Sequence, residues 1–541
     1  VLFQEQDEHL QSLYGTALNI HDIATTMRDE IEDQNILLDE FGVRADRTSS
    51  RLENAMKKVK YIIKANEDNG KFKFSSFWYL YRRNLSFRRF GVVVEENKFS
   101  SFGAITQKLL GPVKRIPRRT QNRSPTCAFR VIWISALLVG EILIFSYAMR
   151  KCSWPYDAHW DTSLANPFRI ALIADPQIID NYSYGRTGIL QRISEVYPDM
   201  YMRKNWINLQ NIFDPDAIIF LGDLMDGGRE WDDDKWEDEF FRYRHLFLPK
   251  KPTRTPIYYL VGNHDIGFGD NIIPSAYDRF RRIFGKTNYN VVLGNHSIIV
   301  VDTVTLSGSD ELLKEEAISL IEKLENDSSN NFPRILMTHV PLYRPQNTDC
   351  GPLRQNGHYI NQGSGYQYQN LIVESLSNFI LDHIKPILVF SGDDHDYCEI
   401  RHERVPEVIE VSVNSFSFAM GVKRPGFLLL SLYNPHNNTS LDSIKNNQTT
   451  FAYTQCLLPN QIRIYLWYGI LVITTLACIF SHTFVKIRRS REMLPVWLRY
   501  QQKGRWIIFN YQFWKTVVKE IISIASVALV TYLICWIWFL I

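Results

Sequence analysis

Five short hydrophobic runs in the middle of the chain each end in polar side chains. One of them reads A-I-I-F-L-G-D from Ala217 to Asp223. Such runs are typical of buried parallel strands, and ligands of α/β folds gather at the carboxyl ends of such strands. The polar residues that close the five runs are Asp175 and Gln177, Asp223, Asn263 with His264 and Asp265, His339, and Asp393 with His395. Because oxygen and nitrogen donors bind metals, the pattern predicts two metal ions at one edge of a sheet.

Amphipathic stretches lie between the hydrophobic runs, for example at residues 310–324 and 369–384. This alternation predicts βαβ units and an α/β fold.

Three longer apolar stretches have the length of membrane spans. They are Val131–Met149, Ile464–Val485 and Ile521–Ile541, and each can cross the ~30 Å of hydrocarbon in a bilayer. The first stretch lies far from the N-terminus, so it is not a signal peptide. It contains Glu141, which is costly in lipid, and we expect this side chain to face another helix rather than to serve a functional relay.

Basic residues beside the apolar stretches predict their orientation. Residues 71–130 hold fourteen Lys or Arg against two acids, and residues 486–519 hold nine against one. The positive-inside rule places both segments in the cytosol and residues 151–463 in a lumen. Beside a membrane span, the basic and aromatic residues of 71–128 favour contact with anionic headgroups over nucleic acid. Six glycosylation sequons lie in the luminal segment, at Asn181, Asn295, Asn326, Asn437, Asn438 and Asn447.

Four of the seven cysteines fall in the predicted luminal segment. An even number in an oxidising compartment indicates disulfides, although four cysteines allow three pairings. We expect the pairs Cys350–Cys398 and Cys152–Cys456.

Residues 5–65 follow a different period. Apolar or small residues recur alternately three and four positions apart, which predicts the seam of a coiled coil. Gln34 interrupts the seam, with seven layers before it and eight after it. A central glutamine in such a seam resembles a SNARE motif of the Q class, and an ordinary dimerising coiled coil is the alternative. Because the chain begins at Val1 and combines unlike parts, we expect a fragment or two joined reading frames, with residues 66–70 as the linker.

The five polar run ends, taken in order, resemble the calcineurin-like metallophosphoesterase family. Its pattern of D-x-H, G-D, G-N-H-D, a lone His and G-H-x-H appears here as Asp175-Pro-Gln177, Gly222-Asp223, Gly262–Asp265, His339 and Gly392–His395. The resemblance covers about residues 167–435 and implies two stacked sheets flanked by helices. Gln177 and Asp393 stand where the family usually has His. Oxygen ligands in place of imidazole favour manganese or magnesium over zinc.

The resemblance also implies the role of each residue. Asp175, Gln177, Asp223 and His395 would hold one divalent cation, and Asp223, Asn263, His339 and Asp393 the other, so that Asp223 bridges the two. His264 would be the general acid or would stabilise the transition state, and Asp265 would orient its ring or raise its pKa. Asp226 and Arg229 would contact the substrate or form a structural salt bridge. His296, His358 and His402 are expected to be bystanders.

Longer matches around the motifs, G-D-L-M-D-G-G-R and G-N-H-D-I-G-F-G-D, resemble one eukaryotic branch of the family. This branch implies a manganese-dependent enzyme of the endoplasmic reticulum or Golgi membrane that removes ethanolamine phosphate from a mannose of GPI anchors. The substrates would be GPI lipid or GPI-anchored proteins, and the other partners membrane lipid and SNARE helices, without nucleic acid. The alternatives are a Q-SNARE fusion protein acting through residues 5–65, and a luminal pyrophosphatase or nucleotide phosphatase.

Together these patterns predict an α/β metallophosphoesterase sandwich, anchored by three transmembrane helices and preceded by a coiled-coil helix. The expected segments are a SNARE-like coiled coil (1–66), a basic cytosolic region (67–130), a span (131–149), the luminal phosphoesterase domain (150–463), a span (464–485), a basic cytosolic loop (486–520) and a span (521–541).

Overall fold

The structure is a computed structural model, and it describes residues 125–161, 166–249, 254–326, 332–403, 407–435, 449–493 and 511–540. The expected coiled coil of residues 5–65 lies outside the described residues. So do most of the basic region 67–130 and the centre of the basic loop 486–520.

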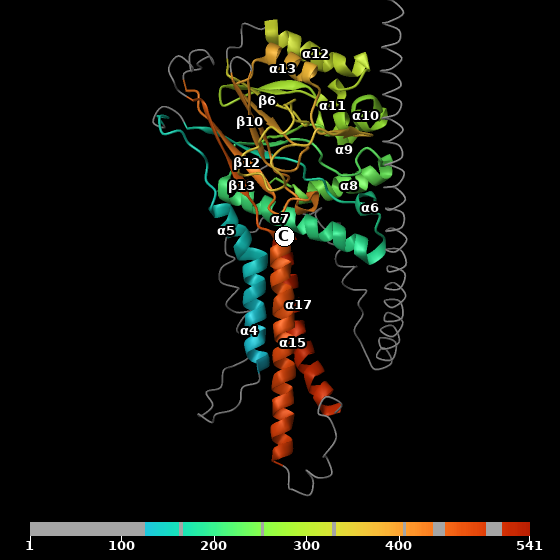
Figure 1. The fold of residues 1–541 in the computed structure, drawn as a ribbon, viewed down its shortest axis with the longest axis vertical. Helices are drawn as coiled ribbons and strands as arrows, with labels where there is room; N and C mark the ends of the chain where they lie inside the picture. Colours follow the sequence, from blue (N-terminus) through green and yellow to red (C-terminus); the bar gives the residue numbers. More distant parts are fainter. Residues whose placement is uncertain are drawn as a thin grey trace, which may run out of the picture. The chain divides into compact units, whose positions relative to one another are not determined.

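Two mixed β-sheets form the centre of residues 168–457 (Figure 1). The first has the order β13-β12-β1-β2-β3 and the second the order β10-β11-β9-β6-β5-β4. The strands of the first are β1 (Phe168–Ile173), β2 (Ala217–Phe220), β3 (Ile257–Tyr259), β12 (Gly426–Leu432) and β13 (Phe451–Leu457). Those of the second are β4 (Tyr289–Leu293), β5 (His296–Val300), β6 (Arg334–Met337), β9 (Leu388–Ser391), β10 (Cys398–His402) and β11 (Val408–Ser412). A small hairpin adds β7 (Ser364–Gly365) and β8 (Tyr368–Gln369). The predicted two-sheet α/β fold is confirmed.

Alternate side chains of the central strands enter different cores. Ile170 and Leu172 of β1 pack between the sheets with Phe390 of the second sheet. Ile173, on the opposite face of β1, packs toward the helices with Trp206. Because both faces of these strands are buried, the strands consist of continuous hydrophobic runs rather than alternating ones.

The five hydrophobic runs of the sequence form β1, β2, β3, β6 and β9. β1, β2 and β3 are parallel neighbours, as are β6 and β9. Parallel neighbours end at the same edge of a sheet, and the backbone N–H of Asp393, after β9, donates to Asp175 Oδ1, after β1, at 3.1 Å. The ends of both sheets therefore meet at one edge of the sandwich.

Helices flank the two sheets (Figure 1). The long helix α7 (Gly188–Phe213) packs Trp206 against Phe220 of the first sheet. Helices α12 (Glu311–Asn326) and α13 (Glu374–Ile384) lie side by side at the other sheet and correspond to the two predicted amphipathic stretches. The shorter helices are α6 (Asn181–Tyr184), α8 (Asp233–Leu246), α9 (Asn263–Ile266), η2 (Gly269–Asn271), α10 (Pro274–Phe284), α11 (Thr303–Leu306) and η3 (Phe418–Met420).

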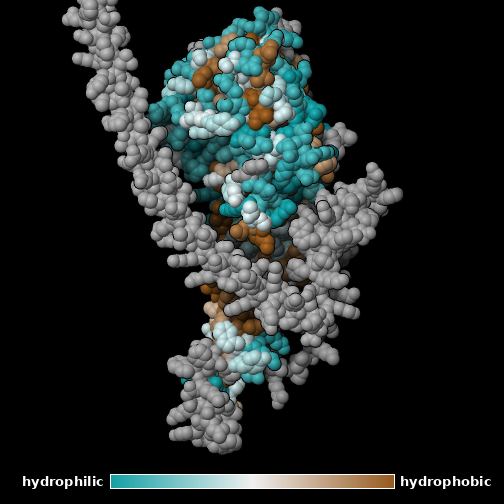
Figure 2. All heavy atoms as spheres, turned by 90° about the vertical axis from the view of Figure 1, so that its right-hand side faces the viewer, coloured by the Kyte–Doolittle hydropathy of each residue, from teal (hydrophilic) through white to brown (hydrophobic). Residues whose placement is uncertain are grey.

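Among the helices of the described residues, three are long and apolar enough to cross a membrane, as predicted. The first is continuous from Pro125 to Arg150 and consists of α4 (Pro125–Leu138), η1 (Val139–Leu143) and α5 (Ile144–Arg150). The others are α15 (Gln461–Glu492) and α17 (Tyr511–Leu540), and α17 contacts both α4 and α15. Figure 2 shows a hydrophobic band over these helices, next to the hydrophilic surface of the sheet domain.

Glu141 of η1 faces two other helices, as expected. Its side chain is 1% exposed, and the Tyr468 hydroxyl of α15 donates to Oε1 at 2.9 Å. Its Oε2 pairs with the ammonium group of Lys204 from α7. A membrane helix is thereby joined to a helix of the sheet domain by a buried ion pair.

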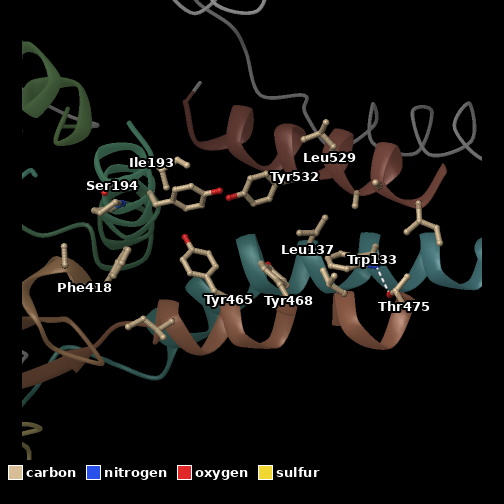
Figure 3. A pocket seen from close by; sticks show the side chains of 18 of the residues that line it. Trp133, Leu137, Ile193, Ser194, Phe418, Tyr465, Tyr468, Thr475, Leu529 and Tyr532 are labelled. Carbon is tan, nitrogen blue, oxygen red and sulfur yellow. Dashed lines mark hydrogen bonds between the residues drawn. The ribbon is translucent and has the colours of Figure 1, made fainter. Parts of the chain in front are cut away.

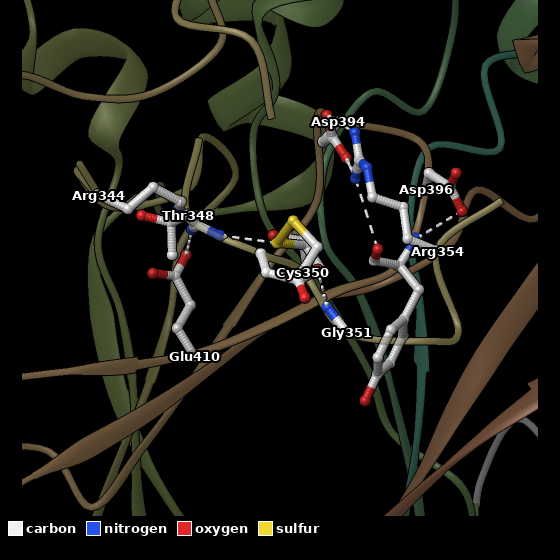
Figure 4. The surroundings of a disulfide bond; sticks show 12 residues. Arg344, Thr348, Cys350, Gly351, Arg354, Asp394, Asp396 and Glu410 are labelled. Carbon is white, nitrogen blue, oxygen red and sulfur yellow. Dashed lines mark hydrogen bonds and ion pairs between the residues drawn. A yellow bond between two sulfur atoms is a disulfide. The ribbon is translucent and has the colours of Figure 1, made fainter. Parts of the chain in front are cut away.

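Both expected disulfides are present, which confirms their pairing. Cys152, just beyond α5, is bonded to Cys456 of β13, with 5.8 Å between the Cα atoms. Cys350, in the loop after β6, is bonded to Cys398 at the start of β10. Arg344 stands beside the second bond and pairs with Glu410 at 2.8 Å (Figure 4).

Candidate metal centre

The predicted ligands occupy an unusual backbone conformation. Asp175, Gln177, Asp223, Asp393 and His395 have φ angles of 45°, 32°, 50°, 64° and 65°. A non-glycine residue in this left-handed region costs about 1–3 kcal/mol, and such strain clusters at functional sites. The strained backbone therefore indicates a functional site at the sheet edge where these strands end.

The structure brings the predicted ligands together in two overlapping groups. Asp175, Asp223 and His395 each offer one ligand atom, and these atoms lie within 4.8 Å of one another. Asp223, His339 and Asp393 form a second group with the same spacing. Asp223 belongs to both groups, which is the arrangement expected of a bridging carboxylate.

His339 is oriented by the backbone of a neighbouring strand end. Its Nδ1 lies 2.8 Å from the carbonyl oxygen of Leu221, so Nδ1–H donates and Nε2 keeps a free lone pair. Nε2 faces Asn263 Oδ1 at 3.1 Å, Asp223 Oδ1 at 3.4 Å and Asp393 Oδ1 at 3.6 Å. These four atoms are the ones that the second predicted site requires.

Two buried oxygens test whether a cation fits the first group. Asp175 Oδ2 and Gln177 Oε1 are buried and have no hydrogen-bond partner in the described structure. The amide of Gln177 donates through Nε2 to Asp223 Oδ2 at 2.8 Å, which leaves its carbonyl oxygen available. Buried oxygens without partners are costly unless a cation or water satisfies them. The donor set thus fits a hard divalent cation beside Asp175, Gln177, Asp223 and His395.

The amide of Asn263 is held by a residue that the sequence did not single out. Asn263 Nδ2 donates to the carbonyl oxygen of Gln367 at 3.0 Å, which turns Oδ1 toward His339. The Gln367 side chain accepts from Phe268 N–H at 2.8 Å and donates to the Asn271 carbonyl at 2.9 Å. Gln367 has a φ of 67°. A polar residue in a loop between short strands carries no motif, so sequence alone gave no signal for it.

His264 lies beside the two groups of metal ligands and belongs to neither of them. Its backbone N–H donates to Asp223 Oδ1 at 2.8 Å. Its ring Nδ1 lies 2.7 Å from the carbonyl oxygen of Asp226 and 3.1 Å from Asp226 Oδ1. Asp226, whose carboxylate also accepts a hydrogen bond from the Ser183 hydroxyl, therefore orients the imidazole.

The expected role of Asp265 is wrong. Its carboxylate accepts from the backbone N–H groups of Gly262 at 2.9 Å and Leu224 at 3.1 Å, not from the His264 ring. These two bonds fix the turn between β3 and α9. Asp265 thus shapes the backbone that presents Asn263 and His264, and the ring-orienting role belongs to Asp226.

Arg229 and Arg354 support the site from outside it. Arg229 Nη1 donates to the carbonyl oxygen of Asn263 at 2.9 Å, which favours the structural alternative for this residue. Arg354, not predicted, forms an ion pair with Asp394, and the backbone N–H of Gln355 donates to Asp396 at 2.9 Å (Figure 4). These contacts anchor the loop after β6 against the Gly392–Asp396 motif.

The pKa values of the metal-centre residues reflect the close packing of several buried carboxyl groups. Burial and the neighbouring carboxylates raise the pKa of Asp175, and they raise the pKa of Asp393 to about 7. Burial lowers the pKa of His395 to about 4, so its imidazole is neutral, as a metal ligand must be. Burial opposes ionisation of Asp223 too, but His339 and His264 hold its pKa below the ordinary value. Bound cations would let all these carboxylates ionise together.

Burial alone would lower the pKa of His264. The Asp223 charge and the hydrogen bond to Asp226 outweigh it and raise the pKa of His264 to about 9. The ring is therefore an imidazolium near neutral pH and can donate a proton.

Comparison with known proteins agrees with this geometry. Residues 168–397 match the calcineurin-like phosphoesterase family. "Cell division control protein 1" of Saccharomyces cerevisiae is 40% identical over 352 residues, which are 62% of this chain and 70% of that protein. "Metallophosphoesterase 1" of Danio rerio is 25% identical over 357 residues, 61% of this chain and 84% of that protein. The chain belongs to the calcineurin-like phosphoesterase family: it is a phosphoric ester hydrolase that depends on two divalent metal ions.

Two further similarities complete the comparison. Residues 1–78 match the SNARE domain family, in agreement with the resemblance seen in residues 5–65. Among solved structures, a dimetal phosphatase from Danio rerio matches with a TM-score of 0.30 and 11% identity, over 49% of this chain and 96% of that one.

Proposed function

We propose that the chain removes ethanolamine phosphate from a mannose of GPI anchors, as a membrane-bound phosphodiesterase. The observation that carries the proposal is the pair of ligand groups that share Asp223, with His264 beside them. The GPI substrate is supported by the branch-specific motifs Gly222–Arg229 and Gly262–Asp270. A domain joined to apolar helices also suits a substrate that is itself anchored in a membrane.

The reaction breaks the bond between phosphorus and the mannose oxygen, and an oxygen from water replaces the sugar. Two bound divalent cations would neutralise the phosphate oxygens and lower the pKa of water enough for attack at neutral pH. His264, held as an imidazolium by Asp223 and Asp226, donates its proton to the departing mannose oxygen. Asp265 and Arg229 keep the turn that presents His264 in place.

Release of ethanolamine phosphate by the detergent-purified full chain tests this function directly. We expect a GPI intermediate to lose the group in the presence of manganese and to remain intact after chelation. Mass spectrometry of the glycan measures the loss, and added manganese should restore it. Protein with two bound metal ions that leaves the intermediate unchanged would overturn the proposal.

We propose manganese as the metal because two positions supply oxygen where imidazole is usual. Gln177 offers an amide oxygen and Asp393 a carboxylate, and oxygen-rich sites favour harder ions. The variant Gln177→His should shift the metal bound from an equal mixture toward zinc. Elemental analysis measures the shift, and an unchanged manganese-to-zinc ratio would contradict this assignment.

We propose that residues 150–463 face the lumen of the endoplasmic reticulum or Golgi, with residues 67–130 and 486–520 in the cytosol. The two disulfides, which need an oxidising compartment, support this orientation. Lys486, Arg488, Arg489 and Arg491 end α15 on the side away from the sheet domain, in accordance with the positive-inside rule.

A pyrophosphatase or nucleotide phosphatase activity of the same site remains the alternative within the family. Hydrolysis rates for pyrophosphate, nucleoside diphosphates and the GPI intermediate, measured side by side, distinguish the two. Preference for the anhydrides would favour the alternative.

Membrane fusion is a second proposed function, supported by the SNARE match of residues 1–78. In that case these residues would supply one helix to a complex with SNARE partner helices. Sequencing the transcript shows whether this segment and the phosphoesterase share one message, and separate messages would overturn the proposal for the native protein.

A further inference from the structure

A large cavity lies between the membrane helices and the phosphoesterase domain (Figure 3). Its volume is about 970 Å³, at the upper end of the range of roughly 300–1,000 Å³ for ligand pockets. Leu137 of the first membrane helix, Leu476 of α15 and Leu529 of α17 supply apolar side chains to its walls. All three of these membrane helices therefore contribute to the walls of one open cavity.

The cavity is elongated along the membrane helices. Its lining on α15 extends from Ile462 to Ile479, which is roughly 25 Å at about 1.5 Å per residue. Near the end far from the phosphoesterase domain, Trp133 Nε1 donates to Thr475 Oγ1 at 3.2 Å (Figure 3). Half of a bilayer's hydrocarbon is about 15 Å thick, so an extended acyl chain fits within this length.

The other end of the cavity is lined by residues of the phosphoesterase domain. Tyr184, at the end of α6, and Arg186 line it from one segment, and Phe418 and Ala419 of η3 line it from another. The Tyr184 hydroxyl donates to the Ala419 carbonyl oxygen at 3.2 Å, so the two segments meet there. Arg186 is an exposed residue, and its guanidinium lies over the Tyr184 ring, with 4.7 Å from its central carbon to the ring centroid. An apolar channel thus ends at a solvent-exposed cation.

The same two segments also contact residues of the metal centre. Ser183, next to Tyr184, donates a hydrogen bond to the Asp226 carboxylate, and Asp226 orients the His264 ring. On the second segment, just before η3, Ser415 Oγ donates to the carbonyl oxygen of Asp175 at 2.8 Å. The segments that line this end of the cavity therefore also contact Asp226 and Asp175 of the metal centre.

We propose that this cavity binds the acyl chains of the lipid substrate, with Arg186 pairing with the lipid phosphate. This inference rests on the proposed function, because in a GPI lipid the phosphatidylinositol would occupy the cavity while the glycan reaches the metals. An acyl chain suits the space because lipid is the solvent around α15 and α17, and the walls offer apolar contact over the length of a chain. The guanidinium supplies the charge that a phosphodiester requires.

Photolabelling tests occupancy of the cavity without any catalysis. The probe is phosphatidylinositol with a diazirine in one acyl chain, added to the purified full chain in detergent. We expect labelled peptides to include cavity residues of α15 and α17. Ala528 lines the cavity, so Ala528→Phe should lower labelling about tenfold, since each buried methylene group contributes roughly fourfold to binding.

Ala477→Phe is the matched control. Ala477 is exposed on α15 and is not among the lining residues, so the same added ring should leave the labelling of cavity peptides at the wild-type level. Equal labelling of Ala528→Phe and wild type would overturn the proposal, as would labels confined to the outer faces of the helices.

Kinetics test whether the bound chains belong to the substrate. For the GPI intermediate relative to soluble bis(4-nitrophenyl) phosphate, the ratio of kcat/KM values should fall about tenfold in Ala528→Phe and in Arg186→Gln. An unchanged ratio together with reduced labelling would show that the cavity holds a resident lipid rather than the substrate, and would overturn the proposal. Failure of the wild type to release ethanolamine phosphate would count against the proposed function, while the labelling result would still decide whether the cavity binds acyl chains.

Discussion

Asp223 connects the two halves of the metal centre. It accepts from the Gln177 amide and the His264 backbone, and it faces His339 Nε2. Gly262 permits this crowding, because a Cβ there would lie 2.1 Å from Asp223 Oδ1. His264, in contrast, contacts Asp223 through its backbone N–H, while its ring contacts the carbonyl and carboxylate oxygens of Asp226.

Substitutions of Asp223 and of His264 should therefore affect metal binding differently. We expect Asp223→Asn to lose both metal ions, because each group loses a carboxylate that no other residue replaces. His264→Ala should keep two manganese ions per chain while kcat falls roughly 10²–10⁴-fold, the usual contribution of a general acid. Elemental analysis and the release assay measure the two properties, and equal metal loss in both variants would exclude His264 from the acid role.

His296 is a buried histidine that belongs to neither ligand group. It is fully buried at the start of β5, and its Nδ1 donates to the Gly294 carbonyl oxygen at 2.8 Å. Burial lowers its pKa from 6.5 to about 4, although the backbone hydrogen bonds act in the opposite direction. Because the unfolded chain binds this proton more tightly, stability is fully present above pH 6.5 and is lost as the pH falls toward 4.

The variant His296→Asn should remove this dependence while keeping a donor to Gly294. Between pH 6.5 and 4, we expect wild type to lose about 3 kcal/mol of stability more than the variant, from a pKa difference of roughly 2.5. Denaturant unfolding of both proteins at several pH values measures the difference. Parallel pH profiles would show that His296 does not titrate on unfolding.

The sequence predicted metal-centre residues and the structure places them together, because their positions follow from the ends of hydrophobic runs. Roles that depend on side-chain direction were harder to predict. Asp265 and Asp226 are both acids near His264, and only the turn geometry shows which one meets the ring. Gln367 acts on Asn263 from 104 positions away, a contact that no local pattern encodes.

At the scale of elements, the hydrophobic patterns predicted the strands and the membrane helices. They did not predict where the membrane helices end. α15 continues to Glu492, beyond the apolar stretch that ends at Val485, because basic residues outside a membrane are good helix formers. The docking of α7 on the first membrane helix was also not predictable. It depends on Lys204, which the sequence shows only as one charge within an amphipathic helix.

The ion pair between Glu141 and Lys204 should couple the membrane helix to α7. Both side chains are almost fully buried, at 1% and 3% exposure. Removing one partner of a buried pair costs about 3–5 kcal/mol, because the other charge remains buried without compensation. Lys204→Met should therefore lower the apparent Tm in detergent markedly.

The double variant Glu141→Gln with Lys204→Met should regain most of that loss, since no buried charge is left. Thermal unfolding of wild type, both single variants and the double variant completes the cycle. Additive losses would indicate that the two groups do not interact.

At the scale of the whole molecule, the metal centre could be predicted from the sequence and the cavity could not. Motifs indicated the metal centre, since each motif is a continuous run of residues. The cavity is lined by Leu137, Tyr184, Phe418, Leu476 and Leu529, which come from five separate segments. It exists only through the way these segments pack, so no pattern along the chain could reveal it.

The orientation of the chain in the membrane can be tested with sequons on its two sides. Asn326 is exposed at the end of α12, in the segment proposed to be luminal. Asn84, in the sequon Asn84-Leu-Ser, belongs to the segment proposed to be cytosolic. Because glycans are added only in the lumen, Asn326→Gln should remove one glycan and Asn84→Gln none. Gel mobility before and after endoglycosidase treatment measures both effects, and a glycan on Asn84 with none on Asn326 would reverse the proposed topology.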